Sequence, residues 1–143
     1  MTARIKHIAL SSDDPAATAA FYQEVFGLKE LRRKPADTGA EGVWLTDGYI
    51  YFAVLKHGSD EAPNLGKGPS TIPGLHHIGF YVDDLDDACQ AIEAAQATEC
   101  DESTKANRKY QGPEGVMIDM RVKGWDEQIK ARAKLYKLTP ASD

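Results

Sequence analysis

The sequence lacks the features that mark secreted, membrane-spanning or nucleic-acid-binding proteins. It contains two cysteines, Cys89 and Cys100, without the paired spacing of a zinc site, so reduced thiols in a cytoplasmic protein are expected, not a disulfide framework. No apolar run approaches the length of a membrane span, and the first residues carry no apolar signal region. The formal net charge of −5 is mild and forms no basic stripe, which argues against nucleic acid or a membrane surface as a partner.

The most informative feature that is present is an internal repeat. Residues 6–14 (KHIALSSDD) align with residues 76–84 (HHIGFYVDD), in a chain whose 143 residues fit one compact domain. The alignment pairs His7 with His77 and Ala9 with Gly79. A histidine beside a small residue packs poorly in a hydrophobic core, but the small residue leaves room for a cavity. The repeat therefore predicts one site built symmetrically by two half-domains.

The first unit, residues 4–56, is expected to have the order β-α-β-β-β. Residues 5–12 alternate as a strand, and Asp14 before a proline predicts a helix start. The helix is expected to end at Gly27 and to turn Phe21, Tyr22 and Val25 inward. Three short strands are predicted after it, with a hairpin turn at Asp47-Gly48: residues 28–34, 42–46 and 49–56.

The second unit, residues 75–122, repeats this order after a linker. Residues 57–74 are rich in glycine, proline and serine and carry no period, which predicts the linker. A strand at 75–82 precedes a helix capped by Asp84, and the last strand is expected at 115–122. Weaker strand signals lie at 98–103 and 107–111. The tail, residues 123–143, has helical character and no counterpart in the first unit, so Trp125 and the tail are expected to cover the pocket mouth or a subunit contact.

A lone acid stands inside the last strand. Asp119 lies between Ile118 and Met120, where a carboxylate is costly unless it is paired, hydrogen-bonded or bound to a metal. By alternation it shares a face with Met117 and Arg121, and an ion pair with Arg121 is the competing interpretation. Two histidines and one carboxylate from three strands form the pattern of non-haem iron and related divalent sites.

With these motifs in this order, the chain resembles the vicinal oxygen chelate superfamily: glyoxalase I, methylmalonyl-CoA epimerase, bleomycin and fosfomycin resistance proteins, and extradiol dioxygenases. The resemblance covers residues 4–122 and rests on the segments KHIALSSDDPAATAAFYQEVFGL, GLHHIGFYVDDLDDACQAI and GPEGVMIDM. It implies an α+β fold in which two βαβββ modules form a curled mixed sheet around one pocket. It also implies that His7, His77 and Asp119 hold a divalent ion, with Fe2+, Mn2+ and Zn2+ all suited to such ligands.

Two positions depart from the family's four-ligand members. Aligning residues 47–52 with 114–119 sets Phe52 opposite Asp119, where glyoxalase I and the epimerases generally take a fourth ligand. Phe52 cannot ligate, and Tyr51 and Ala53 are expected to face the helices, so the pattern is closer to extradiol dioxygenases and fosfomycin-type thiol transferases. Asp119 is also about 1.5 Å shorter than the usual glutamate, so its strand is expected to lie closer to the ion.

Four residues are expected to contact a substrate: Phe52 and Tyr81 as pocket walls, and Tyr110 and Arg121 as polar contacts. An exposed strand edge explains Tyr110 equally well. Only one side chain of His76-His77 can face the pocket, and the repeat selects His77, which leaves His76 at the surface or orienting its neighbour. No residue stands out as the general base, so none is assigned.

The sequence thus favours a metal-dependent, dioxygenase- or lyase-like enzyme that acts on a small substrate with vicinal oxygens, in a cytoplasmic homodimer. The ion would act as a Lewis acid. The alternative is a metal-free protein that sequesters a small molecule, as the bleomycin resistance type does. A pure binder does not need a histidine at both repeat positions, which is the feature that separates the two.

Overall fold

The computed structural model of the chain describes residues 1–38, 40–59 and 72–136. Its elements follow the repeated order expected from the sequence, with each unit running strand, helix and three strands. The first unit contains β1 (Ala3–Ser12), α1 (Pro15–Phe26), β2 (Lys29–Lys34), β3 (Gly42–Thr46) and β4 (Tyr51–Lys56), with a 3-10 turn at Ala36–Thr38. The second contains β5 (Gly74–Val82), α2 (Leu85–Ala94), β6 (Thr98–Glu99), β7 (Arg108–Gln111) and β8 (Met117–Arg121), with a 3-10 turn at Pro113–Gly115, and α3 (Trp125–Tyr136) follows. Most of the expected linker, residues 60–71, lies outside the described residues.

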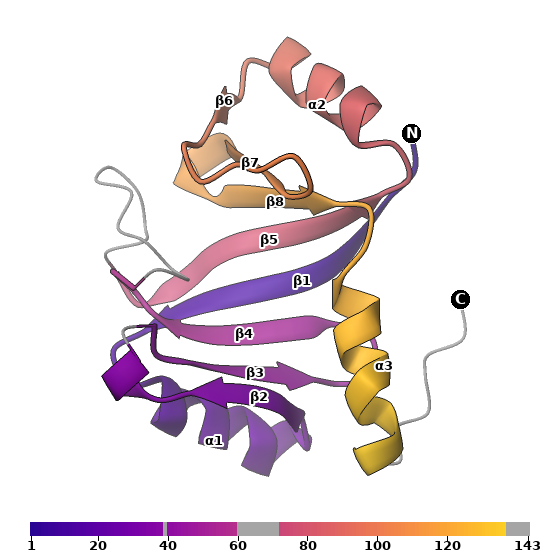
Figure 1. Cartoon of the computed structure of the whole chain (residues 1–143). Helices are drawn as coiled ribbons and strands as arrows, with labels where there is room; N and C mark the ends of the chain where they lie inside the picture. The colour runs from indigo at the N-terminus through magenta and orange to yellow at the C-terminus, as the bar shows by residue number, and fades with distance from the viewer. Residues whose placement is uncertain (39, 60–71, 137–143) are drawn as a thin grey trace.

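The eight strands form one mixed, open sheet in the order β2-β3-β4-β1-β5-β8-β7-β6. The two repeated strands, β1 and β5, pair antiparallel at its centre (Figure 1). Each has the last strand of its own unit on its outer side in parallel pairing, β4 beside β1 and β8 beside β5. The predicted α+β fold of two βαβββ modules is confirmed.

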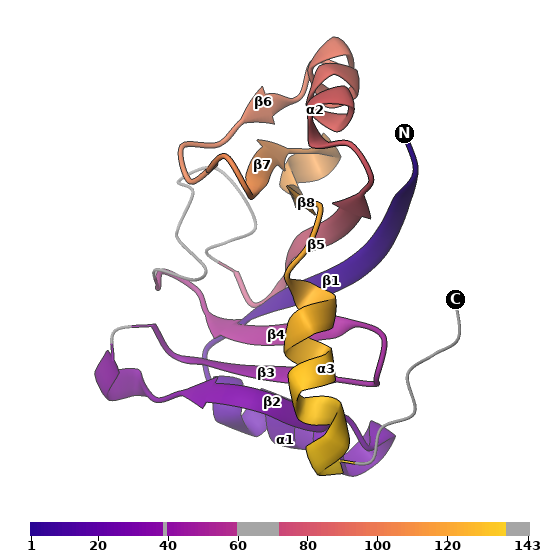
Figure 2. The same ribbon diagram turned by 45° about the vertical axis from the view of Figure 1, so that its right-hand side comes forward.

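Helices α1 and α3 cover opposite faces of the first unit. Side chains from β3 and β4 alternate between the two: Val43 and Val54 pack under α1, whereas Trp44 and Ala53 pack in the cluster that includes Trp125 of α3. Helix α2 covers the corresponding face of the second unit, where it packs over Met120. Both views show α3 crossing the strands of the first unit (Figures 1 and 2). It lies on the sheet face opposite α1 and α2, which is called the concave face below.

The helix termini form as expected, but one helix face does not. Asp14 caps α1 by accepting a hydrogen bond from a backbone N–H, and Gly27 ends the helix in the left-handed conformation. The expectation that Phe21 and Val25 point inward is wrong, since they are 54% and 57% exposed. The sheet is contacted instead by the small Ala19 and neighbouring side chains of that face. None of the described helices is long and apolar enough to span a membrane.

A β-bulge in β1 changes the direction of one side chain. The pairing of β1 with β5 runs from Ile5↔Phe80 to His7↔Gly79, so Lys6 has no partner of its own. An extra residue of this kind redirects the side chain that it carries. Lys6 is buried and forms an ion pair with Asp126 at the start of α3, with 2.6 Å between Nζ and Oδ1. The bulge therefore ties the C-terminal helix to the centre of the sheet.

Candidate metal centre

Three buried side chains meet on the concave face. One ligand atom from each of His7, His77 and Asp119 lies within 4.8 Å of the others. The histidines come from the two central strands and the acid from β8, which pairs with β5 so that Asp119 stands beside Gly79. The short acid reaches the histidines because β8 is the direct neighbour of β5. The structure thus brings together the three residues that the sequence singles out as ligands.

His7 has the hydrogen-bond arrangement of a metal ligand. Its Nδ1 lies 2.6 Å from the backbone oxygen of Tyr51, and Nδ1 must donate because a carbonyl only accepts. A neutral His7 then carries its lone pair on Nε2, the atom that faces His77. Burial lowers the pKa of His7 from 6.5 to about 3, so the imidazole is neutral over the physiological range.

The second histidine is oriented by its neighbour in the sequence. His77 Nε2 lies 2.8 Å from His7 Nε2, and His77 Nδ1 lies 2.7 Å from Nδ1 of His76. Burial lowers the pKa of His77 well below its ordinary value. His76 itself is buried, so of the two positions expected for it the structure places it against its neighbour and not at the surface.

Asp119 supplies the negative charge. Burial raises the pKa of its carboxyl above the ordinary value, and the nearby charges of Arg121 and Lys109 act in the opposite direction. Oδ2 lies 3.5 Å from a guanidinium nitrogen of Arg121, which is long for a hydrogen bond. Oδ1 is buried and has no hydrogen-bond partner within the described part of the chain.

This donor set fits a divalent cation. Two neutral imidazoles and one carboxylate form a ligand set that Fe2+, Mn2+ and Zn2+ all accept. Two ligands at right angles on one ion, each at about 2.1 Å, stand roughly 3 Å apart, and the two Nε2 atoms are separated by 2.8 Å. The unpartnered Oδ1 of Asp119 is a buried acceptor that a cation would satisfy.

The cavity at this centre is small and strongly polar. Its volume is about 90 Å3. Besides the three candidate ligands, its lining contains three cationic side chains, a glutamine and an aromatic rim: Arg32, Lys109, Arg121, Gln128, Trp44, Tyr51, Trp125 and, beside them, Leu55. Most of these residues carry no signal in the sequence, because their facing depends on strand pairings that only the fold determines.

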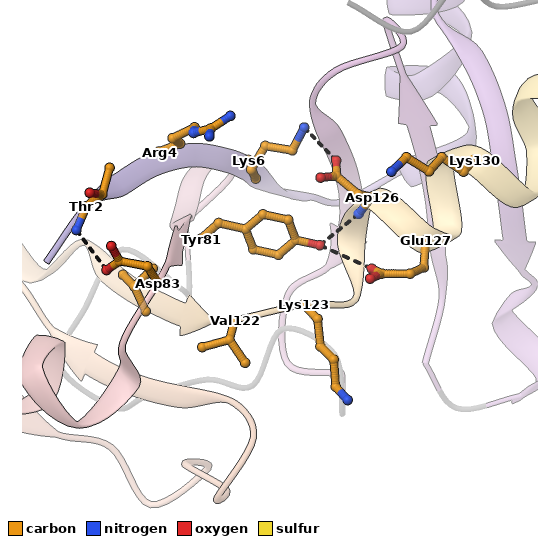
Figure 3. A pocket seen from close by; sticks show the side chains of 11 residues that line it. Thr2, Arg4, Lys6, Tyr81, Asp83, Val122, Lys123, Asp126, Glu127 and Lys130 are labelled. Carbon is orange, nitrogen blue, oxygen red and sulfur yellow. Dashed lines mark hydrogen bonds and ion pairs between the residues drawn. The ribbon is translucent and has the colours of Figure 1, made fainter. Parts of the chain in front are cut away.

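Trp125 and helix α3 cover the cavity on the side that faces away from the sheet. The Trp125 ring stacks on His7, with centroids 5.1 Å apart and 26° between the planes, and on Tyr81 at the same centroid distance. Gly79 leaves the room for this, since a Cβ there would lie 2.6 Å from both His7 and Trp125. The first turn of α3 is anchored by Lys6 and by the Tyr81 hydroxyl, which accepts a hydrogen bond from the Asp126 backbone at 2.8 Å (Figure 3). Of the two positions predicted for Trp125, the structure shows the pocket mouth.

Two of the expected substrate contacts lie on the wrong face. Phe52 packs against Tyr22 of α1, 4.9 Å between ring centroids, and is not in the pocket. Tyr110 is fully buried on the α2 face and donates a hydrogen bond to Glu93 of that helix. Both errors are slips of one residue in strand parity, and Tyr51 and Lys109 occupy the pocket side instead.

The corrected parity also changes which residue corresponds to Asp119. The parallel pairings match Ala9↔Ala53 in the first unit with Gly79↔Asp119 in the second. The position equivalent to Asp119 is therefore Ala53, which faces the concave side and has no ligand atom.

The other two expected contacts lie on the concave face. Arg121 lines the cavity. Tyr81 lies one layer away, beyond Trp125, on a separate hollow of about 370 Å3 beside the start of α3 (Figure 3). In that hollow Lys6 forms an ion pair with Asp126, and the backbone N–H of Thr2 donates a hydrogen bond to Asp83.

Comparison with known proteins agrees with the fold. The sequence matches the Glyoxalase/Bleomycin resistance protein/Dioxygenase superfamily over residues 4–120, and the chain belongs to this family. No curated protein gives a significant match.

Solved structures of similar fold include several epimerases. A methylmalonyl-CoA epimerase variant of Streptomyces coelicolor in complex with 2-nitronate-propionyl-CoA is 22% identical, with a TM-score of 0.58 over 82% of this chain and 92% of that one. A selenomethionine methylmalonyl-CoA epimerase is 25% identical, with a TM-score of 0.55 over 81% and 92%. A hypothetical protein from Bacillus halodurans C-125 is 18% identical, with a TM-score of 0.60 over 84% and 94%.

Proposed function

We propose that the protein is a metal-dependent enzyme in which His7, His77 and Asp119 hold one divalent ion. The observation that carries this proposal is the meeting of two neutral, buried imidazoles with a buried carboxylate whose Oδ1 has no partner among the described residues. An unpaired buried acceptor is costly unless something satisfies it. When bound, the ion would act as a Lewis acid on a substrate that presents two neighbouring oxygens.

The chain's own residues prepare the site for such a substrate. Tyr51 fixes the tautomer of His7 through its backbone oxygen, and His76 orients His77. Trp125 and α3 exclude water from the side of the cavity that the sheet leaves open. Ala53 at the position equivalent to Asp119 offers no fourth protein ligand, which leaves more coordination positions for the substrate and favours the three-ligand members over the glyoxalase I type.

The alternative is a metal-free protein that sequesters a drug-sized molecule. Sites for drug-sized ligands generally measure about 300–1,000 Å3, whereas this cavity measures about 90 Å3 and is covered by Trp125. The cavity size and the pair of histidines both support the metal-dependent enzyme. A cytoplasmic location is part of the same proposal and is supported by Cys89 and Cys100, which are free thiols. A homodimer stays a prediction.

Metal analysis tests the proposal. Protein purified without chelators and loaded with Zn2+, Mn2+ or Fe2+ should hold one ion per chain after gel filtration. Asp119→Ala should lose the ion while its circular dichroism stays unchanged, and the exposed Asp101→Ala should keep it. A wild-type protein that retains no ion, or an Asp119→Ala variant that retains it fully, would overturn the proposal and favour the binder.

A further inference from the structure

We propose that the cavity selects a small oxyanion, a compact carboxylate or phosphonate, as the molecule that binds beside the ion. This rests on the proposed function and names the substrate class of the same site. It is carried by the charge, the unsatisfied donors and the size of the cavity.

The cavity concentrates positive charge in a protein that is negative overall. Its lining holds three cationic side chains, Arg32, Lys109 and Arg121, against one carboxylate, Asp119. The excess of two positive charges contrasts with the formal charge of −5 for the chain. A divalent ion would double that excess. Neutralising Asp119 requires one cation, so the other two are available for an anionic ligand. The attraction between such opposite charges is stronger in a site with little water than in bulk water.

Arg121 keeps a donor for such a ligand. Its Nε is buried and has no hydrogen-bond partner in the part of the chain that the structure describes. Its guanidinium carbon lies 4.9 Å from the ring centre of Trp125, and its contact with Asp119 is long. A guanidinium matches the geometry of a carboxylate or phosphonate group, which can accept two parallel hydrogen bonds.

Lys109 stands on the neighbouring strand, directly across from Asp119. Its side chain lines the same cavity as His7, His77 and Asp119. Within the described part of the chain, Lys109 forms no ion pair with an acid. Lys109 from the neighbouring strand and Arg121 from the same strand as Asp119 thus line one cavity, so an anion bound beside the ion would lie near both positive charges.

The third cation is held at the rim. The guanidinium of Arg32 lies over the ring of Trp44, 3.8 Å from the centroid. Its neighbour Arg33 instead pairs with Glu30 outside the cavity, at 2.8 Å. Stacking fixes Arg32 without using its hydrogen-bond donors, so it adds positive potential at the entrance.

The cavity size favours a small ligand. The cavity volume of about 90 Å3 is well below the roughly 300–1,000 Å3 of sites for drug-sized ligands. A compact acid is therefore the expected ligand while Trp125 and α3 cover the cavity.

Calorimetric titration of three small anions, each with a neutral counterpart, tests the inference on the full chain. The pairs are pyruvate and pyruvamide, lactate and lactamide, and methylphosphonate and its dimethyl ester. At least one anion should bind the zinc-loaded protein ten-fold or more tightly than its counterpart. Lys109→Met and Arg121→Met should each lower that affinity about ten-fold or more, because each variant removes a hydrogen bond in which donor and acceptor are both charged. The control variants Lys105→Met, an exposed lysine, and Arg33→Met should bind like the wild type.

The outcomes separate this inference from the proposed function. If zinc is retained but no anion binds more tightly than its neutral counterpart, or Lys109→Met binds like the wild type, the inference is wrong and the metal site stands. If the protein retains no ion, the proposed function fails, and the same titrations on the metal-free protein still decide whether the cavity prefers anions. Metal content measured for every variant shows that a lost affinity does not come from a lost ion.

Discussion

The indole of Trp125 stacks on the imidazole of His7, with 5.1 Å between ring centroids and 26° between the planes, so the C-terminal helix is packed directly on a candidate metal ligand. Trp125 is 1% exposed and Gly79 provides the space for it. The helix that carries it has no counterpart in the first unit. The site that the two repeats build together is therefore closed by an element that belongs to neither.

Gly79→Ala should destabilise the protein. The new Cβ would lie 2.6 Å from atoms of both His7 and Trp125, so the ring stack must shift. Overpacking of this kind costs about 1–3 kcal/mol, whereas alanine in a strand is otherwise no worse than glycine. Urea denaturation, followed by tryptophan fluorescence, measures the effect. An unfolding free energy equal to or above that of the wild type would show that Trp125 does not pack there.

His76→Ala should weaken metal binding without abolishing it. His76 touches the ring nitrogen of His77 that faces away from the ion site, and groups in this position typically contribute 10–100-fold in metal affinity. Competition with a fluorescent zinc chelator measures the change. His57→Ala is the matched control, since His57 pairs with Asp13 outside the cavity. Equal affinities for the two variants would remove His76 from the site.

Asp126→Ala should loosen helix α3. Lys6 is buried, and removing its partner leaves the ammonium without its ion pair, at a cost of roughly 1.5–3 kcal/mol. Hydrogen exchange should then speed up across residues 125–132 before it changes in the sheet. Asp86→Ala is the control, because Asp86 also lies in the first turn of a helix but is exposed. Equal exchange at residues 125–132 in both variants would show that the ion pair between Lys6 and Asp126 does not hold α3 in place.

Acid should destabilise the metal-free protein through its buried histidines. The pKa of His7 falls from 6.5 to about 3 on folding, so between these values the unfolded chain binds a proton that the folded chain does not. Stability is then fully present above pH 6.5 and declines as the pH falls, by about 1.4 kcal/mol per pH unit for each such group. His77 acts in the same direction, and Asp119, whose pKa is raised by burial, acts in the opposite one.

His7→Gln isolates this contribution. Between pH 6 and pH 4 the stability of the variant, measured by urea denaturation with chelator present, should decline less steeply than that of the wild type, by about 1.4 kcal/mol per pH unit. Identical slopes would mean that His7 takes up its proton in the folded state.

The sequence predicts best where the argument stays within one strand. In β1 and β5, alternation and the repeat place His7 and His77 on the concave face. In β8, the apolar neighbours of Asp119 occupy the face that packs under the helix, so Asp119 also lies on the concave face. These inferences need only the local two-residue period of a strand. The three candidate ligands therefore follow from the sequence.

Prediction fails where facing depends on the length of a turn. The sequence alignment sets Phe52 opposite Asp119 only if the two turns before these strands are alike. Asp47 instead accepts hydrogen bonds from the backbone of Tyr49 and Ile50, which delays β4 to Tyr51. The other turn has Glu114 in the left-handed region, with φ of 57°. One residue of difference reverses every side chain in the strand.

The metal centre is tested most directly by a crystal structure of the protein soaked in Zn2+, with data collected on both sides of the zinc absorption edge. The account predicts one strong anomalous peak, about 2.0–2.2 Å from Nε2 of His7, Nε2 of His77 and a carboxylate oxygen of Asp119. A fully loaded crystal whose only peaks lie elsewhere, or a peak that touches the histidines without Asp119, would contradict it.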